Sequence, residues 1–207
     1  VYENPAKDGT TDGDFMMIND YIGTWHGDLD QYAEWNKVVK MNPDKPMVPS
    51  EFGLCEPAFS GGDARRNEIF LEKMTCYRKY PNIAGTIYFC LNDYRTQMGE
   101  EGEGKFCQRV HGSTDLCGNP KPSYYTVSEE CAPVILEKEG SQIKIICRNN
   151  LPSYTVQGYS LLVLDKENKK EIRIPKLLPG MSWTTILEKG DVTVQILRPN
   201  GEIVVEK

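Results

Sequence analysis

The hydrophobic pattern of this 207-residue chain changes near residue 132, and that change constrains the fold more than any other feature. Before it, short apolar runs alternate with longer segments in which apolar residues recur every three or four positions, which is typical of strands alternating with helices. After it, short runs with partial two-residue alternation lie between Gly, Pro and Asn turns. We therefore predict two domains, 1–132 and 133–207.

The first half reads as an α/β domain. Three runs are expected to be strands: 14–21, 46–53 and 83–91. Three segments are expected to be helices: 28–43, 63–81 and 121–131, the last one following a polar, Gly-rich loop. This order predicts parallel strands covered by helices, an arrangement that closes into a barrel only with eight such units. Three strand–helix units cannot close it.

The second half reads as an all-β domain. Seven short runs with partial alternation occur within 133–207, and the Asn200-Gly201 pair is a strong hairpin signal. This spacing is typical of a β-sandwich of the immunoglobulin type. We find no cluster of chemical groups there and expect the sandwich to be a structural appendage.

Charge and cysteine content exclude several classes of protein. The net charge of -6 argues against a nucleic-acid binder and against binding to anionic membranes. No run approaches the roughly 18 apolar residues of a membrane span. Seven cysteines occur without a CxxC pair, so no structural zinc site is expected. Most of them are expected to be reduced and buried, and Cys107 and Cys117 are the best candidates for a disulfide. The compartment stays open between the periplasm or cell exterior and the cytoplasm.

Polar and aromatic side chains gather at the predicted ends of the three strands. In the stretch "KPMVPSEFGLCEP" (45–57), Glu51 stands where the second strand ends. The ends of parallel strands meet at one rim, where α/β barrels place their chemistry. A carboxylate among aromatic and amide groups suits a sugar ring, although a solvated loop glutamate is the plain alternative. The other rim residues are Asn19, Tyr21, Trp25, His26, Asp93 and Tyr94.

Four segments in order resemble glycoside hydrolase family 2, the group of β-galactosidases, β-glucuronidases and β-mannosidases. They are "INDYIGTWHGD", "KPMVPSEFG", "GTIYFCLNDYRTQ" and "GNPKPSYYTV". The resemblance covers nearly the whole chain. It implies about the last three units of a (β/α)8 TIM barrel, residues 1–132, followed by an immunoglobulin-like sandwich, residues 133–207.

The resemblance also implies roles for individual residues. Glu51 matches the catalytic nucleophile of a retaining glycosidase, which forms a covalent glycosyl-enzyme. Asn19 and Tyr21 match the family's Asn-x-Tyr, whose tyrosine would hydrogen-bond the nucleophile. Phe89 stands where relatives often have the tryptophan that floors the sugar subsite. Asp93 matches an acidic residue that is structural or lines the site.

Trp25 matches an aromatic residue that shapes the sugar pocket or packs in the loop. Glucuronidases of the family carry an Asn-x-Lys that this chain lacks in "MGEEGEGKFCQRVHG" (98–112). The acidic run Glu100, Glu101 and Glu103 would repel a uronate, so a neutral, galactose-like sugar is favoured. A β-glucuronidase or a β-mannosidase remains the alternative within the family.

The sequence lacks the second carboxyl that such an enzyme needs. Family members carry it after an asparagine, and the Asn-Glu of this chain, Asn67-Glu68, falls inside a predicted helix. Asp20, Glu56 and Asp93 stand near the rim without the family context. We therefore expect the proton donor upstream of Val1, and the chain to be an inactive fragment of a longer enzyme.

Other functions remain open alongside this one. The chain could be a non-catalytic carbohydrate-binding or assembly module. No cofactor is expected, and His26 and His111 lack partners at the spacing of a metal site. The expected partner is a carbohydrate, and the exposed edges of an open sheet would favour a homo-oligomer.

Overall fold

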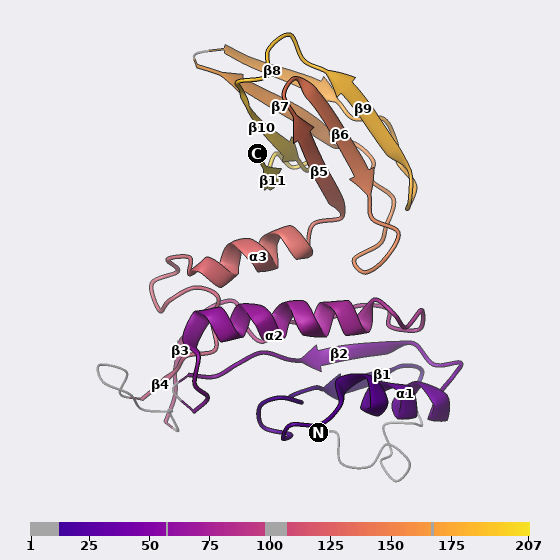
Figure 1. Cartoon of the computed structure of the whole chain (residues 1–207), viewed down its shortest axis with the longest axis vertical. Coiled ribbons are helices and arrows are strands. Elements are labelled where there is room, and N and C mark those ends of the chain that lie inside the picture. The colour runs from indigo at the N-terminus through magenta and orange to yellow at the C-terminus, as the bar shows by residue number, and fades with distance from the viewer. Residues whose placement is uncertain (1–12, 57, 98–106, 167) are drawn as a thin grey trace. The chain divides into compact units, whose positions relative to one another are not determined.

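The computed structural model describes residues 13–56, 58–97, 107–166 and 168–207 (Figure 1). The chain divides into two compact units, Val1–Val127 and Ser128–Lys207. The division falls within helix α3 (Pro122–Glu130), close to the change of pattern in the sequence. The assignment of the two domains by type stays a prediction.

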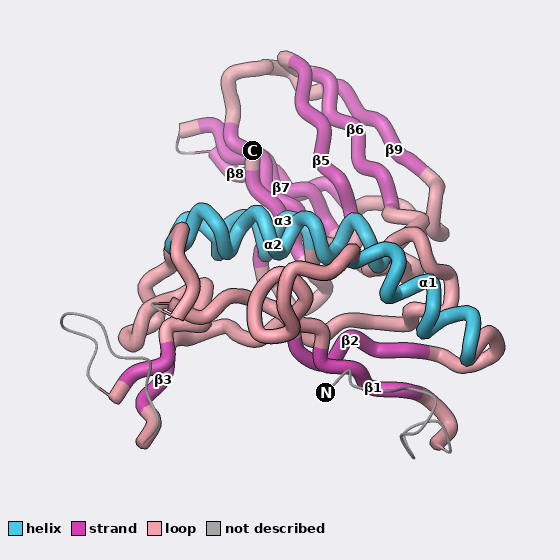
Figure 2. The backbone as a smooth tube through the Cα atoms, turned by 60° about the horizontal axis from the view of Figure 1, so that its bottom comes forward, coloured by secondary structure: helices cyan, strands magenta, loops and turns pink. Residues whose placement is uncertain are grey.

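Unit 1 alternates strands and helices over its described residues. Its elements are β1 (Met16–Asn19), α1 (Gln31–Met41), β2 (Met47–Glu51), α2 (Gly62–Tyr77), β3 (Tyr94–Arg95) and β4 (Gln108–Arg109). Strands β1 and β2 are parallel neighbours, and both helices lie along one side of the pair (Figure 2). The order strand, helix, strand, helix therefore agrees with the sequence pattern.

The predicted strand at 83–91 is wrong as a regular strand. The segment runs beside β2, but Ala84 N–H donates to Met47 O and Ile87 N–H donates to Pro49 O. Between these two hydrogen bonds the segment advances by three residues while β2 advances by two. One extra residue is the mark of a β-bulge, and it interrupts the ladder. Over the described residues no closed barrel is present, and the segment is an extended neighbour of β2.

The core of unit 1 lies between the sheet and its helices. Met16 and Ile18 of β1 are buried, whereas Met17, which alternates with them, is about half exposed. Helix α1 starts at Asp30, whose carboxylate accepts from Ala33 N–H, a typical N-cap. The rings of Phe52, Phe70 and Tyr77 pack together and tie α2 to the residues after β2.

Unit 2 consists of two antiparallel sheets. One has the order β5 (Val134–Glu139), β6 (Gln142–Cys147), β9 (Ser182–Ile186). The other has the order β11 (Ile203–Glu206), β10 (Thr193–Leu197), β7 (Ser160–Asp165), β8 (Asn168–Arg173). Alternate aliphatic residues of both sheets form one buried core, which includes Leu136, Ile143, Ile145, Leu161 and Ile196. The two-residue alternation thus matches the observed sheets.

In the part of the chain that the structure describes, no helix combines the length and apolar character needed to cross a bilayer.

Candidate active site

The ends of β1 and β2 bring Glu51 and Tyr21 together. Asn19 and Glu51 are partners in the parallel register, and Asp20 N–H donates to Glu51 O at 2.7 Å. Just beyond, the Tyr21 hydroxyl donates to Glu51 Oε2 at 3.1 Å. Tyr21 is 7% exposed and Glu51 is half-buried. A carboxylate at a strand end is therefore held by a phenol while part of it stays accessible.

The environment keeps the Tyr21 hydroxyl protonated. Burial raises the pKa of Tyr21 far above its usual range, and the nearby Glu51 carboxylate raises it further. A phenol that keeps its proton over the whole physiological range donates a steady hydrogen bond. Tyr21 therefore fixes one oxygen of Glu51.

Asn19 lies beside this pair. Ser50 Oγ donates to Asn19 Oδ1 at 2.7 Å, across the register of β1 and β2. The bond occupies the oxygen of the amide and fixes the orientation of the side chain. Asn19, Tyr21 and Glu51 are thus brought to one edge of the sheet, as the parallel strands require.

Phe89 reaches the same region through a close backbone approach. Phe89 N–H donates to Phe52 O, and a Cβ on Gly53 would lie 2.3 Å from Phe89 O. Only glycine leaves room for this contact two residues after Glu51. The Phe89 ring meets the edges of Tyr94 and His111, at centroid distances of 6.0 and 5.2 Å.

Trp25 lies in the turn after β1 and is 46% exposed. Its ring meets Phe59 edge to face, with centroids 4.6 Å apart. His26 turns back toward the strand, because its Nδ1 accepts from Tyr21 N–H at 3.2 Å. The turn therefore presents Trp25 outward and keeps His26 against Tyr21.

Asp20 faces inward and is 2% exposed. Its carboxylate accepts from Lys73 Nζ at 2.6 Å, from Trp35 Nε1 at 2.7 Å and from the Tyr77 hydroxyl at 2.9 Å. Gln31 adds a further bond at 2.6 Å. Sequence reasoning missed this cluster, although a lysine on the apolar face of α2 was a visible signal of a buried partner.

Opposing effects set the ionisation of this cluster. Burial acts to raise the pKa of Asp20, but the charge of Lys73 and the bonds from Lys73, Trp35 and Tyr77 hold it below the usual value. Burial lowers the pKa of Lys73, and Asp20 offsets part of that effect. Asp20 thus stays a carboxylate and is unsuited to donate a proton.

Asp93 also faces the protein interior, at 6% exposure. Its Oδ1 lies 2.8 Å from Lys121 Nζ and accepts from Gly112 N–H at 2.9 Å. Gln108 contacts the second oxygen at 3.4 Å. This placement agrees with the structural alternative for Asp93 more closely than with a sugar contact.

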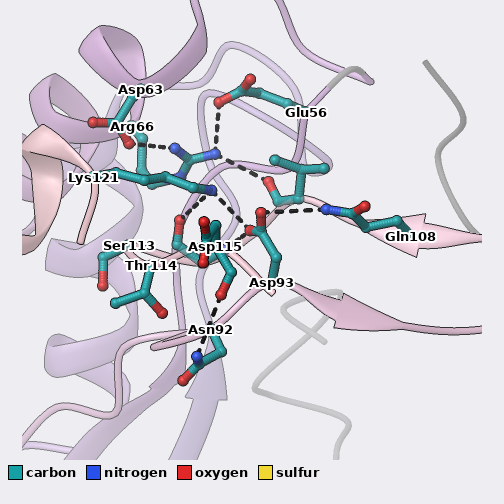
Figure 3. Close-up of polar contacts among 12 residues, drawn as sticks. Glu56, Asp63, Arg66, Asn92, Asp93, Gln108, Ser113, Thr114, Asp115 and Lys121 are labelled. Carbon is teal, nitrogen blue, oxygen red and sulfur yellow. Dashed lines mark hydrogen bonds and ion pairs between the residues drawn. The ribbon is translucent and has the colours of Figure 1, made fainter. Parts of the chain in front are cut away.

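Glu56 belongs to a second buried ion cluster. Arg66, with no exposed surface, donates to Glu56 Oε1 at 2.7 Å and to Asp63 Oδ1 at 2.5 Å (Figure 3). Ser123 Oγ donates to the same Asp63 oxygen at 2.6 Å. Glu68 pairs on the surface with Arg65 at 3.0 Å, as an ordinary helical pair does. Asp20, Glu56 and Asp93 are therefore all paired with cations.

Two further sequence predictions concern cysteines and the acidic loop. Cys107 and Cys117, the best candidates for a disulfide, are both free. Glu100, Glu101 and Glu103 lie outside the described residues. Over the described residues, no group of three His, Cys, Asp or Glu side chains could hold a metal ion.

No protein-family model matches this chain, and no curated protein matches it. A solved β-glucuronidase of Bacteroides uniformis is 14% identical with a TM-score of 0.50, covering 94% of this chain and 25% of that chain. B. uniformis β-glucuronidase 2, covalently bound to cyclophellitol-6-carboxylate aziridine, is 14% identical with a TM-score of 0.49, and the match covers 94% of this chain and 25% of that chain. A putative β-galactosidase from Bacteroides fragilis is 10% identical with a TM-score of 0.48, and the match covers 93% of this chain and 32% of that chain.

The chain thus spans about a quarter to a third of the length of these proteins. At this low identity, the likeness to the B. uniformis β-glucuronidase concerns the fold alone. The chain therefore has a fold related to part of a glycoside hydrolase.

Proposed function

We propose that this chain carries the nucleophile half of the active site of a retaining glycoside hydrolase of family 2. The proposed substrate is a β-linked glycoside of a neutral, galactose-like sugar. The observation that carries the proposal is the bond from Tyr21 to Glu51 Oε2 at the ends of two parallel strands. This is the arrangement that the sequence motif leads one to expect around a nucleophile.

In the proposed reaction, Glu51 attacks the anomeric carbon of the bound sugar. The bond to the leaving oxygen breaks, that oxygen takes the electron pair, and a glycosyl ester forms on Glu51. Water then cleaves the ester with retained configuration. Tyr21 holds one carboxylate oxygen, so the other is free to attack, while Asn19 and Phe89 would bind the hydroxyl edge and the apolar face of the sugar.

A retaining enzyme also needs a proton donor about 5–5.5 Å from its nucleophile. Among the described residues, the rim carboxylates Asp20, Glu56 and Asp93 are each paired with a buried cation or with Lys121. Asp20 in particular is a poor acid, because, against the effect of burial, Lys73, Trp35 and Tyr77 hold its pKa below the usual value. We therefore propose that the donor is supplied by residues outside this sequence, together with the other units of a TIM barrel.

The choice of sugar rests on the sequence. The acidic run from Glu100 to Glu103 would disfavour a uronate, and the missing Asn-x-Lys points the same way. A panel of nitrophenyl β-galactoside, β-glucuronide and β-mannoside at equal concentration would rank the three sugars. Faster reaction with the β-glucuronide would reject the neutral-sugar proposal while leaving the glycosidase proposal standing.

The test uses leaving groups of different acidity. Dinitrophenolate leaves without protonation, whereas phenolate needs a proton donor. With dinitrophenyl β-galactoside, the 207-residue chain should release up to one equivalent of dinitrophenol and then stop. With phenyl β-galactoside it should release none. Glu51→Gln should abolish the release; an equal release from that variant would contradict the proposal.

A non-catalytic carbohydrate-binding module is the second candidate. It is favoured by the pairing of Asp20, Glu56 and Asp93 with cations, which leaves Glu51 without a second acid among the described rim residues. Binding of galactosides without any release of dinitrophenol would favour this candidate. Steady turnover of phenyl β-galactoside would instead reject both this candidate and the missing proton donor.

A further inference from the structure

The carboxylate of Asp20 is the centre of a buried hydrogen-bond network. Its Oδ1 accepts from Lys73 Nζ at 2.6 Å and from Ile22 N–H at 3.2 Å. Its Oδ2 accepts from three side chains of the helices α1 and α2: Gln31 Nε2 at 2.6 Å, Trp35 Nε1 at 2.7 Å and the Tyr77 hydroxyl at 2.9 Å. We call Asp20 and its four side-chain partners the Asp20 network. Both oxygens of the carboxylate are in use.

Asp20 fixes the main chain on both sides of Tyr21. Its own N–H donates to Glu51 O at 2.7 Å, which joins the ends of β1 and β2. Its Oδ1 accepts from Ile22 N–H, which belongs to the peptide group directly after Tyr21. Because the helices hold this carboxylate, they also set the place of the Tyr21 main chain. The hydroxyl at the end of that side chain donates to Glu51 Oε2 at 3.1 Å.

The network needs both oxygens of a carboxylate. A carboxylate accepts at each oxygen, whereas an amide offers one acceptor and one NH2 donor. In Asp20→Asn, either the donors at Oδ1 or the three donors at Oδ2 would therefore face an NH2 group. A buried donor without an acceptor is costly, so the main chain next to Tyr21 is expected to shift.

We propose that Asp20 is a positioning residue for the reaction of Glu51 and acts through Tyr21. The inference rests on the proposed function. The side chains of Asp20 and Lys73 are 2% and 3% exposed, so neither touches a substrate. Asp20 acts by keeping the Tyr21 hydroxyl on Glu51 Oε2, which directs the other oxygen for attack. A misdirected reacting group slows the chemical step even when the substrate still binds.

A pair of substitutions that removes both charges separates positioning from stability. Asp20→Asn alone leaves Lys73 as an unpaired buried cation, whereas Asp20→Asn with Lys73→Met should regain most of the stability. With dinitrophenyl β-galactoside, this double variant should release dinitrophenol about tenfold more slowly at saturation, with a nearly unchanged half-saturating concentration. A purely structural role predicts the normal rate once stability returns, and that result would overturn the proposal.

Tyr21→Phe tests whether Asp20 acts through the tyrosine. It should slow the release about tenfold, the loss of one hydrogen bond to a charged group. Adding the double substitution should slow it little further, because both changes remove the same contact. The control is Met74→Ala, at a residue of α2 that is 1% exposed and outside the Asp20 network; it should lower stability but not the rate. Fully additive losses, or equal slowing by Met74→Ala, would overturn the proposal.

Nuclear magnetic resonance separates this proposal from the proposed function. In a chain with isotope-labelled tyrosines, the Cζ signal that disappears in Tyr21→Phe belongs to Tyr21 and reports its hydrogen bond without any reaction. Glu51→Gln should shift this signal by removing the charged acceptor. Asp20→Asn with Lys73→Met should shift it in the same direction.

Two outcomes distinguish the proposals. Both shifts, with no release of dinitrophenol from the unmodified chain, would reject the nucleophile and retain Asp20 as the residue that positions Tyr21. Release of dinitrophenol from the unmodified chain, with the Tyr21 signal of the double variant unchanged, would retain the nucleophile and reject the positioning role.

Discussion

The two units bury different kinds of side chain. In unit 1, Asp20, Arg66, Lys73 and Asp93 are all less than 7% exposed. In the described part of unit 2, the fully buried side chains are mainly aliphatic, and Arg148, at 9%, donates to the main-chain oxygens of Glu129 and Ala132. A buried charge needs a partner ion, because an unpaired one is strongly destabilising. Buried ion pairs are concentrated in unit 1, where they support the strand end that carries Tyr21.

Breaking the Asp20–Lys73 pair should cause the largest loss of stability. Asp20→Asn keeps the shape of the side chain but leaves Lys73 Nζ as an uncompensated buried cation, which should cost about 3–5 kcal/mol of the free energy of unfolding. Hydrogen exchange read by mass spectrometry should show faster exchange in β1 and α2. Unchanged exchange there would mean that the pair does not stabilise unit 1.

A substitution that creates a cavity in the core of unit 2 should have the next largest effect on stability. Leu161 has no exposed surface, and Leu161→Ala should cost about 3 kcal/mol through lost contacts and a cavity. Exchange should accelerate in β7 and β10, which are paired neighbours. Because the core of unit 2 is apolar, this loss should be the same at pH 4 and pH 7. A strong pH dependence would break the contrast between the units.

Acid should destabilise unit 1 more than unit 2, without any substitution. The Lys73 charge and the hydrogen bonds to Asp20 hold its pKa below the usual value against the effect of burial, and bonds from Ser123 and Arg66 do the same for Asp63. A carboxyl with a lowered folded-state pKa adds stability above its unfolded pKa of about 4 and loses it as the pH falls through the folded value.

Among the described residues of unit 2, the groups with a shifted pKa do not include a carboxyl. The pKa of Cys147, of Tyr159 (to about 12) and of Lys189 is raised, so these groups titrate in the alkaline range. A brief pepsin digestion at pH 3 should therefore cut unit 1 before unit 2. First cleavage within 128–207 would contradict the prediction.

The smallest effect is expected at an exposed pair. Lys144 and Glu137 lie 2.9 Å apart with side chains 43% and 48% exposed. Lys144→Met should change the free energy of unfolding by less than about 1 kcal/mol, because water screens such pairs. Urea unfolding measures this change. A loss comparable to that of Asp20→Asn would show that burial is not what distinguishes the two pairs.

The sequence predicted the elements well where the pattern is regular. The order of strands and helices in unit 1 and the strands of unit 2 followed from hydrophobic period, and parallel strand ends brought Asn19, Tyr21 and Glu51 together. The bulge opposite β2 was not predictable, because register depends on contacts across strands. The Asp20 cluster was missed, since residues far apart in sequence, Asp20 and Lys73, meet only in the fold.

Covalent labelling tests the proposal that Glu51 is the nucleophile. The chain would be incubated with dinitrophenyl 2-deoxy-2-fluoro-β-galactoside, whose leaving group needs no proton donor and whose fluorine slows hydrolysis of the ester. Peptide mapping by mass spectrometry would locate the label, with Glu51→Gln as the control. We expect one fluorogalactosyl group, attached to Glu51. A label on any other residue, or the same labelling of the Glu51→Gln chain, would contradict it.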